Sequence, residues 1–109
     1  MGELSAHGGA SLTYELGANS DGSPLLELAG ELDMTNADAL EAVMNPVLTP
    51  APSRLVVDVS GLLFGDSSAI ALFVKWANLV GQVELREPPE LLRRVIARMG
   101  LSGRLRVTP

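Results

Sequence analysis

The chain has 109 residues, enough for one folded domain, and its 47% of hydrophobic residues excludes a disordered chain. It contains no cysteine, so disulfides and thiolate metal sites are excluded, and its only histidine is His7. The formal net charge is −5, although residues 86–109 contain six arginines against two acids. An acidic body argues against direct nucleic-acid binding and favours a basic partner surface, unless the charge serves solubility alone.

The N-terminal region predicts neither a targeting signal nor a membrane segment. No apolar run approaches the ~18 residues of a membrane span. Residues 1–11 lack the basic start and the apolar core of a secretory signal. We therefore expect a cytoplasmic protein without membrane insertion. Residues 1–10, rich in Gly and Ala, predict a disordered leader before a single domain over residues 11–109.

The domain opens with the pattern of a β-hairpin. Residues 11–16 alternate between apolar and polar types, and residues 25–30 form a second short apolar run. Between them lies a cluster of turn residues that contains Asp21 and Gly22. These features predict an antiparallel pair of strands at the start of a sheet.

The rest of the chain alternates helical and strand patterns. The almost wholly apolar residues 54–60 are typical of a central strand buried on both faces. Alternation of this kind predicts right-handed crossovers, so the remainder of the sheet should be largely parallel. The expected elements are a helix that opens at Thr35 or Asn36 and becomes irregular near Pro46, a strand over residues 54–60, a helix over residues 67–80 that Gly81 ends, a strand over residues 82–87, a helix over residues 88–100 and a strand over residues 103–108.

Two of the predicted helices have apolar faces that can be placed by helical spacing. In the last helix one apolar face comprises Leu91, Leu92, Val95, Ile96 and Met99. In the helix over residues 67–80, spacing of 100° per residue places five residues toward the sheet: Ile70, Phe73, Val74, Ala77 and Val80. Leu72, Trp76 and Leu79 then lie on the opposite face, where they predict an exposed patch for a protein partner. The alternative is that another helix covers them.

An acid and two hydroxyls, Asp66, Ser67 and Ser68, lie where the strand over residues 54–60 gives way to this helix. Asp66 or Ser67 would cap the helix, which is worth about 1 kcal/mol. A serine hydrolase would need a base, and the only histidine is His7 in the leader. The glycines and lysine of a phosphate-binding loop are missing. We therefore expect no enzyme activity and no cofactor or metal.

Three stretches, LELAGELD, RLVVDVSGLLFGDSS and LRRVIARMGLSGRLRV, occur in the order and spacing of the STAS domain. The chain thus resembles this family over about residues 12–107, and in particular the bacterial anti-sigma factor antagonists. The specific parts are Gly-Glu-Leu-Asp at 30–33 and Asp-Ser-Ser at 66–68. The resemblance implies one α/β domain: a mixed sheet of about five strands, with an N-terminal antiparallel hairpin and a largely parallel remainder, covered by helices.

The resemblance also implies roles for individual residues. Ser67 matches the family's phosphorylated serine, and the implied partner is an anti-sigma factor that is also a serine kinase. Unphosphorylated antagonist binds this kinase and frees the sigma factor, and phosphorylated antagonist lets go. The implied partner-binding residues are Asp33, Asp66, Ser67, Ser68, Leu72, Trp76 and Leu79. Gly65 and Ala69 depart from the family pattern, which has a large apolar residue and a glycine at these positions.

Two functional hypotheses follow. The first is a binding switch, an anti-sigma factor antagonist that phosphorylation of Ser67 releases from its kinase. The alternative is a constitutive STAS interaction subunit of a transport or stress-signalling complex, in which Ser67 and Ser68 act only as helix caps. The sequence leaves the sigma factor and the oligomeric state open.

Overall fold

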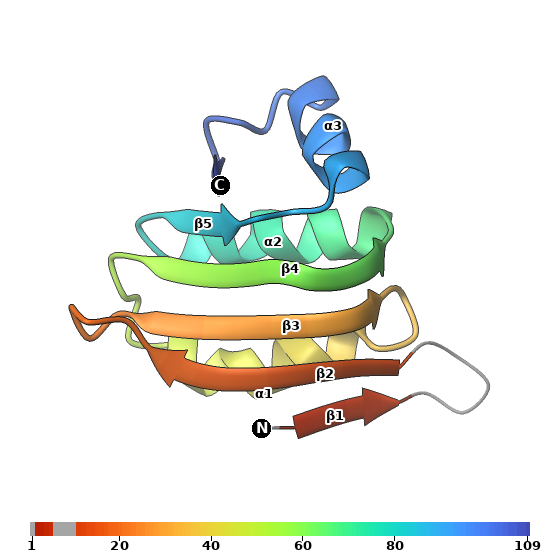
Figure 1. The fold of residues 1–109 in the computed structure, drawn as a ribbon. Helices are drawn as coiled ribbons and strands as arrows, with labels where there is room; N and C mark the ends of the chain where they lie inside the picture. The colour runs from red at the N-terminus through yellow and green to blue at the C-terminus, as the bar shows by residue number, and fades with distance from the viewer. Residues whose placement is uncertain (1, 6–10) are drawn as a thin grey trace.

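The computed structural model describes residues 2–5 and 11–109. In chain order the elements are β1 (Gly2–Ser5), β2 (Ser11–Ala18), β3 (Pro24–Leu32), α1 (Ala37–Leu48), β4 (Leu55–Gly65), α2 (Ser67–Leu79), β5 (Val83–Arg86), α3 (Glu90–Arg98) and β6 (Leu105–Thr108) (Figure 1). This order confirms the expected α/β domain with an opening hairpin. Among the described residues no helix has the length and apolar character to cross a membrane.

The strands form one mixed sheet in the order β1-β2-β3-β4-β5-β6. The pairs β1/β2 and β2/β3 are antiparallel, and the three following pairs are parallel. The sheet therefore has one strand more than the five expected, because residues 2–5 pair with β2, with Leu4 opposite Leu12. The predicted disorder of the leader is wrong for residues 2–5, where Leu4 packs against the core. Residues 1 and 6–10 lie outside the described part of the chain.

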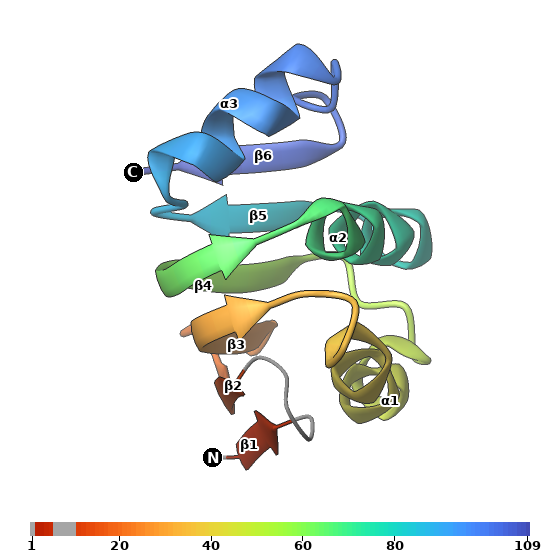
Figure 2. The ribbon, with the colours of Figure 1, turned by 90° about the vertical axis from the view of Figure 1, so that its right-hand side faces the viewer.

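The helices are placed unequally around the sheet. Figure 2 shows α1 and α2 side by side against one face, and α3 lies at the β5–β6 end (Figures 1 and 2). Alternate residues of the strands point into the core beneath the helices, as in the pairs Leu26 and Leu28 of β3, Val57 and Val59 of β4, and Val83 and Leu85 of β5. The core residues include Leu26, Leu28, Val57, Val59, Leu85, Leu40, Met44, Phe73 and Trp76.

The orientation of α2 differs from the prediction. Trp76 is 0% exposed and Leu72 is 5% exposed, whereas Leu79 is 46% exposed. The prediction of an exposed patch is therefore wrong for Leu72 and Trp76, and only Leu79 is exposed as expected. The physical reason is that α2 packs against the sheet and also against α1, which lies beside it on the same face, so two of its sides are buried. Apolar periodicity alone does not separate these two sides, since both are apolar.

Strand β4 is longer than predicted and brings the functional turn to one edge of the sheet. It continues five residues beyond residue 60, and this extension pairs with β3, where Gly65 lies opposite Leu32. Two register shifts accompany this pairing. At the first residue of the Gly-Glu-Leu-Asp stretch, Gly30 has φ +104°, and a Cβ there would lie 2.5 Å from the Ser11 carbonyl oxygen. Only glycine fits this position without strain.

Candidate functional site

Asp66 caps helix α2. Its backbone is extended, and its Oδ1 accepts a hydrogen bond of 2.8 Å from the backbone N–H of Ser68. The expected cap is thus confirmed, and the capping residue is Asp66. A cap of this kind contributes about 1 kcal/mol, and a carboxylate also suits the positive end of the helix dipole. The cap accounts for the acid of the Asp-Ser-Ser stretch but not for its two hydroxyls.

The two serines have different surroundings. Ser67, the first residue of α2, is exposed and borders a groove against α3. Ser68 is half-buried and borders a second groove between α1 and α2. A kinase therefore has freer access to the Ser67 hydroxyl than to that of Ser68.

Asp33 lies in the neighbouring loop between β3 and α1. Its Oδ1 accepts hydrogen bonds from the backbone N–H of Thr35, at 2.8 Å, and from the Thr35 hydroxyl. The buried side chain of Asn36 braces the same loop: its amide donates to the Glu31 carbonyl at 2.9 Å, and its Oδ1 accepts from the Asp33 N–H at 3.1 Å. Asn36 occupies the N-cap position of α1, but its side chain makes no capping hydrogen bond. These contacts fix the Asp33 carboxylate within its own turn.

The structure brings the Asp33 loop and the Asp66–Ser68 turn to the same edge of the sheet. The Asp66 N–H donates to the Leu32 carbonyl at 3.4 Å, which ties the end of β4 to the end of β3. Figure 1 shows the two connections next to each other at the carboxyl ends of β3 and β4. Four of the seven candidate site residues, Asp33, Asp66, Ser67 and Ser68, thus lie on one surface. Trp76 and Leu72 do not join them, because they are buried.

Two grooves flank the Ser67–Ser68 turn, and they differ in chemistry. The α1–α2 groove has a volume of about 410 Å³ and is partly charged, since it contains Asp38, Glu41 and Lys75. The hydrogen bond from Lys75 to Glu41 raises the pKa of the Lys75 ammonium. The α2–α3 groove has a volume of about 300 Å³ and is mainly apolar. Its lining residues are Gly65, Asp66, Ser67, Ile70, Leu91, Leu92, Val95 and Met99.

Exposed apolar side chains gather around this turn. Six large apolar residues in the described part of the chain are exposed: Leu16, Met34, Leu63, Leu79, Leu91 and Met99. Leu91 and Met99 line the α2–α3 groove, Leu63 lies next to it, and Met34 lines the α1–α2 groove. The sequence interpretation placed Leu91 and Met99 on one apolar face of helix α3 but did not identify that face as an exposed surface.

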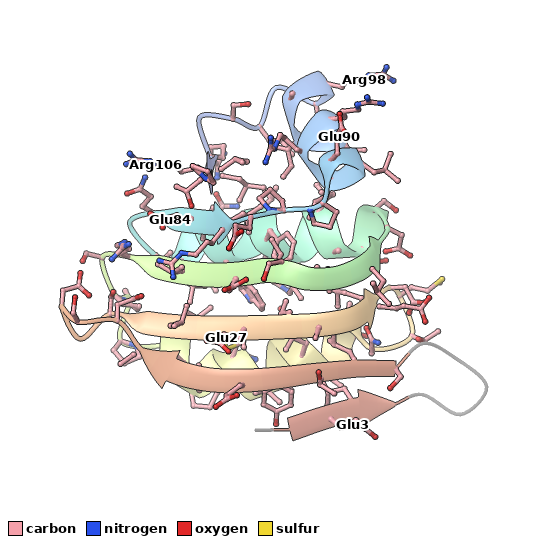
Figure 3. All side chains as sticks on the ribbon, in the orientation of Figure 1. Glu3, Glu27, Glu84, Glu90, Arg98 and Arg106 are labelled. Atoms are coloured by element: carbon pink, nitrogen blue, oxygen red, sulfur yellow. The ribbon has the colours of Figure 1, made fainter. Side chains whose placement is uncertain are left out.

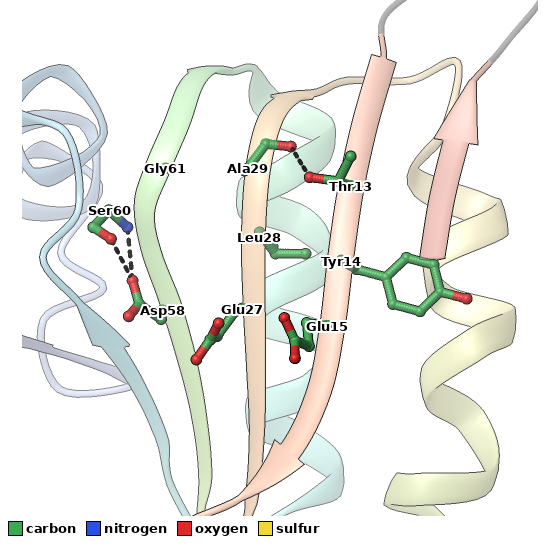
Figure 4. Close-up of a pocket in the computed structure, with 9 residues that line it drawn as sticks. All are labelled: Thr13, Tyr14, Glu15, Glu27, Leu28, Ala29, Asp58, Ser60 and Gly61. Atoms are coloured by element: carbon green, nitrogen blue, oxygen red, sulfur yellow. Dashed lines mark hydrogen bonds between the residues drawn. The ribbon is translucent and has the colours of Figure 1, made fainter. Parts of the chain in front are cut away.

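The opposite face of the sheet carries a shallow hollow of about 240 Å³ (Figure 4). Glu15, Glu27 and Asp58 line it from three neighbouring strands, in register with one another. Asp58 accepts hydrogen bonds from the N–H and hydroxyl of Ser60, at 3.0 and 2.7 Å. No group of three or more His, Asp or Glu residues in residues 2–5 and 11–109 has the geometry to hold a metal ion.

Comparisons with known proteins agree with this fold. The family model described as "Mlab, STAS domain" matches residues 17–108. The chain is 29% identical over 93 residues to the anti-sigma-F factor antagonist RsfB of Mycobacterium tuberculosis, which covers 83% of this chain and 76% of the relative.

Solved structures give the same result. An anti-sigma factor antagonist from Mycobacterium paratuberculosis superposes with a TM-score of 0.79 at 26% identity, covering 90% of this chain and 86% of the other. The Bacillus cell fate determinant SpoIIAA in its phosphorylated form has a TM-score of 0.71 at 20% identity, covering 89% and 92% of the two chains. The latter likeness concerns the fold alone.

Proposed function

Because this chain belongs to the STAS domain family, we propose that it is an anti-sigma factor antagonist, a protein that binds an anti-sigma factor and so frees a sigma factor. The name of its Mycobacterium tuberculosis relative supports this role. Such a protein regulates transcription indirectly and works in the cytoplasm, where the sigma factor meets RNA polymerase. It acts by binding, not by catalysis.

The exposed hydroxyl of Ser67 carries the proposal of a phosphorylation switch. The partner is an anti-sigma factor with serine kinase activity, and it transfers phosphate to Ser67. Phosphate adds about −1.5 to −2 charges at pH 7. At the N-terminus of α2 this charge is favourable by up to about 1 kcal/mol. Within a docked interface, like charges brought together cost several kcal/mol, so the complex dissociates.

The partner surface consists of the turn and the loop beside it. Asp33, Asp66, Ser67 and Ser68 share one edge of the sheet, which supports a common role in binding. Leu72 and Trp76 are buried and serve the core instead. Leu79 is exposed, but it lies in the last turn of α2, away from Ser67 at the first.

Phosphate mapping tests the switch directly. The protein is incubated with ATP and purified anti-sigma kinases encoded in its own genome, and the phosphorylated residue is identified by mass spectrometry. We expect phosphate on Ser67, none in Ser67→Ala, and undiminished labelling in the matched control Ser68→Ala. Phosphate on Ser68 with Ser67 unmodified would contradict the assignment. Tight binding without any phosphorylation would instead identify the constitutive interaction subunit.

A further inference from the structure

We infer that the α2–α3 groove receives an apolar side chain of the anti-sigma factor, and that a carboxylate beside this side chain pairs with Arg98. The inference rests on the proposed function and adds the chemistry of the partner's contact surface. Ser67 lines this groove, so a phosphate on Ser67 would displace the inserted side chain.

The groove has the size and the walls for one side chain. Its volume of about 300 Å³ is at the lower end of the range for small-molecule sites, roughly 300–1,000 Å³. Ile70 and Leu92, at 4% and 5% exposure, form its buried floor. Leu91 and Met99, at 66% and 59% exposure, form its open rim. An inserted apolar side chain would cover this rim and gain apolar contact on both sides.

No described segment of the chain covers these apolar side chains. Two of the six exposed apolar side chains line the groove, and a third, Leu63 at 84% exposure, lines an adjoining hollow that shares Leu91 and Leu92 with it. Single exposed apolar residues are common on protein surfaces, whereas grouped ones mark interaction sites. The grouping beside Ser67 makes the groove continuous with the surface on which the proposed kinase acts.

Two charged side chains lie at the groove: Asp66, whose carboxylate caps α2, lines it, and Arg98 extends from α3. Figure 3 shows the Arg98 side chain projecting from α3 away from the sheet. Arg98 lies seven positions after Leu91 and three after Val95, so helical spacing places it beside the rim. Arg94 is already paired with Glu90 at 3.0 Å, but Arg98 forms no ion pair among the described residues. A partner carboxylate is therefore the complementary group.

This arrangement explains why phosphate would release the partner. The Ser67 hydroxyl borders the groove, so a phosphate there would stand at its mouth. An apolar side chain could then enter only by passing a dianion, which it would have to desolvate. The partner's carboxylate, held by Arg98, would meet the phosphate as a like charge. Occupation of the groove and phosphorylation of Ser67 are thus mutually exclusive.

The test measures binding of groove variants to a panel of purified anti-sigma factors encoded in the same genome, by titration calorimetry. Leu91→Glu and Met99→Glu should weaken binding at least tenfold. Leu79→Glu, a matched change at an exposed leucine in the last turn of α2, should stay within twofold of wild type. Thermal melts establish that each variant is folded, and Leu91→Ser replaces Leu91→Glu if the glutamate lowers the melting temperature.

Two charge-reversal variants test the proposed contact between Arg98 and a carboxylate of the partner. Arg98→Glu should weaken binding at least tenfold at low salt, and the loss should shrink as salt is raised. Arg106→Glu is the control, because Figure 3 shows Arg106 at the far side of the molecule from Arg98. If the wild type binds no anti-sigma factor, the proposed function fails and the groove assignment falls with it. If the wild type binds but the groove variants bind equally well, or Leu79→Glu binds as weakly as they do, only the groove assignment is overturned.

Discussion

Trp76→Ala should unfold the protein more readily and should not act as a selective binding mutation. The indole is fully buried and packs on Phe73, with ring centroids 5.8 Å apart at an interplanar angle of 53°. Truncating a buried aromatic residue to alanine costs about 3–5 kcal/mol. The whole domain has roughly 5–16 kcal/mol of stability at ~0.05–0.15 kcal/mol per residue, so this loss is a large fraction of it. The melting temperature should fall by roughly 12–25 °C, at about 4–5 °C per kcal/mol.

The measurement is urea unfolding followed by far-ultraviolet circular dichroism, because Trp76 is the only tryptophan and its removal abolishes the fluorescence signal. Trp76→Phe is the graded control. Its cost should stay below about 2 kcal/mol, since the indole Nε1 has no hydrogen-bond partner among the described residues and phenylalanine keeps most of the apolar contact. Leu79→Ala, at a half-exposed position, should change stability by less than about 1 kcal/mol. A Trp76→Ala protein within about 1 kcal/mol of wild type would show that the indole is not packed in the core.

Three further outcomes are expected. Asp66→Ala should lower the free energy of unfolding by about 1 kcal/mol through loss of the cap, whereas Asp66→Asn should stay close to wild type; equal losses in urea melts would argue against a capping role. Gly30→Ala should destabilise the fold by roughly 1–3 kcal/mol, because of the positive φ and the close Ser11 carbonyl; an unchanged melt would mean that this backbone relaxes freely. No ester should be hydrolysed, because Ser67 has no residue placed to take its proton; turnover of p-nitrophenyl acetate that Ser67→Ala removes would contradict this.

The order of the elements was predictable because each carries a local signal. The period-2 pattern of residues 11–16, the apolar run at 54–60 and the glycines that follow α2 and α3 are legible without tertiary information. Strand β1 was not, because Gly2–Ser5 has little strand propensity and becomes a strand only by pairing with β2. The extension of β4 to Gly65 likewise depends on its pairing with β3.

Which face of a helix is buried was harder to predict than where the helix lies in the sequence. Helix α2 is apolar on most of its circumference, so periodicity gave two candidate buried sides and no means of choosing between them. In the structure Phe73 and Trp76 are both fully buried, and Leu72 borders the groove between α1 and α2. In α3 the apolar face was predictable, but its burial was not, because only Leu92 and Ile96 of that face are buried. Both cases concern which neighbour covers a surface, and that depends on contacts between elements far apart in the chain.

The residues that stabilise the fold are different from those proposed to bind the partner. Trp76 and Leu72 belong to the core, whereas Ser67, Leu91 and Met99 are exposed at one edge of the domain. Since Ser67 is already solvated, a phosphate there requires no repacking, and the dipole of α2 favours it by up to about 1 kcal/mol. The same charge in a closed interface costs several kcal/mol, and every 1.4 kcal/mol is tenfold in affinity. One phosphate can therefore abolish binding while the fold persists, because the cost falls on contacts that exist only in the complex.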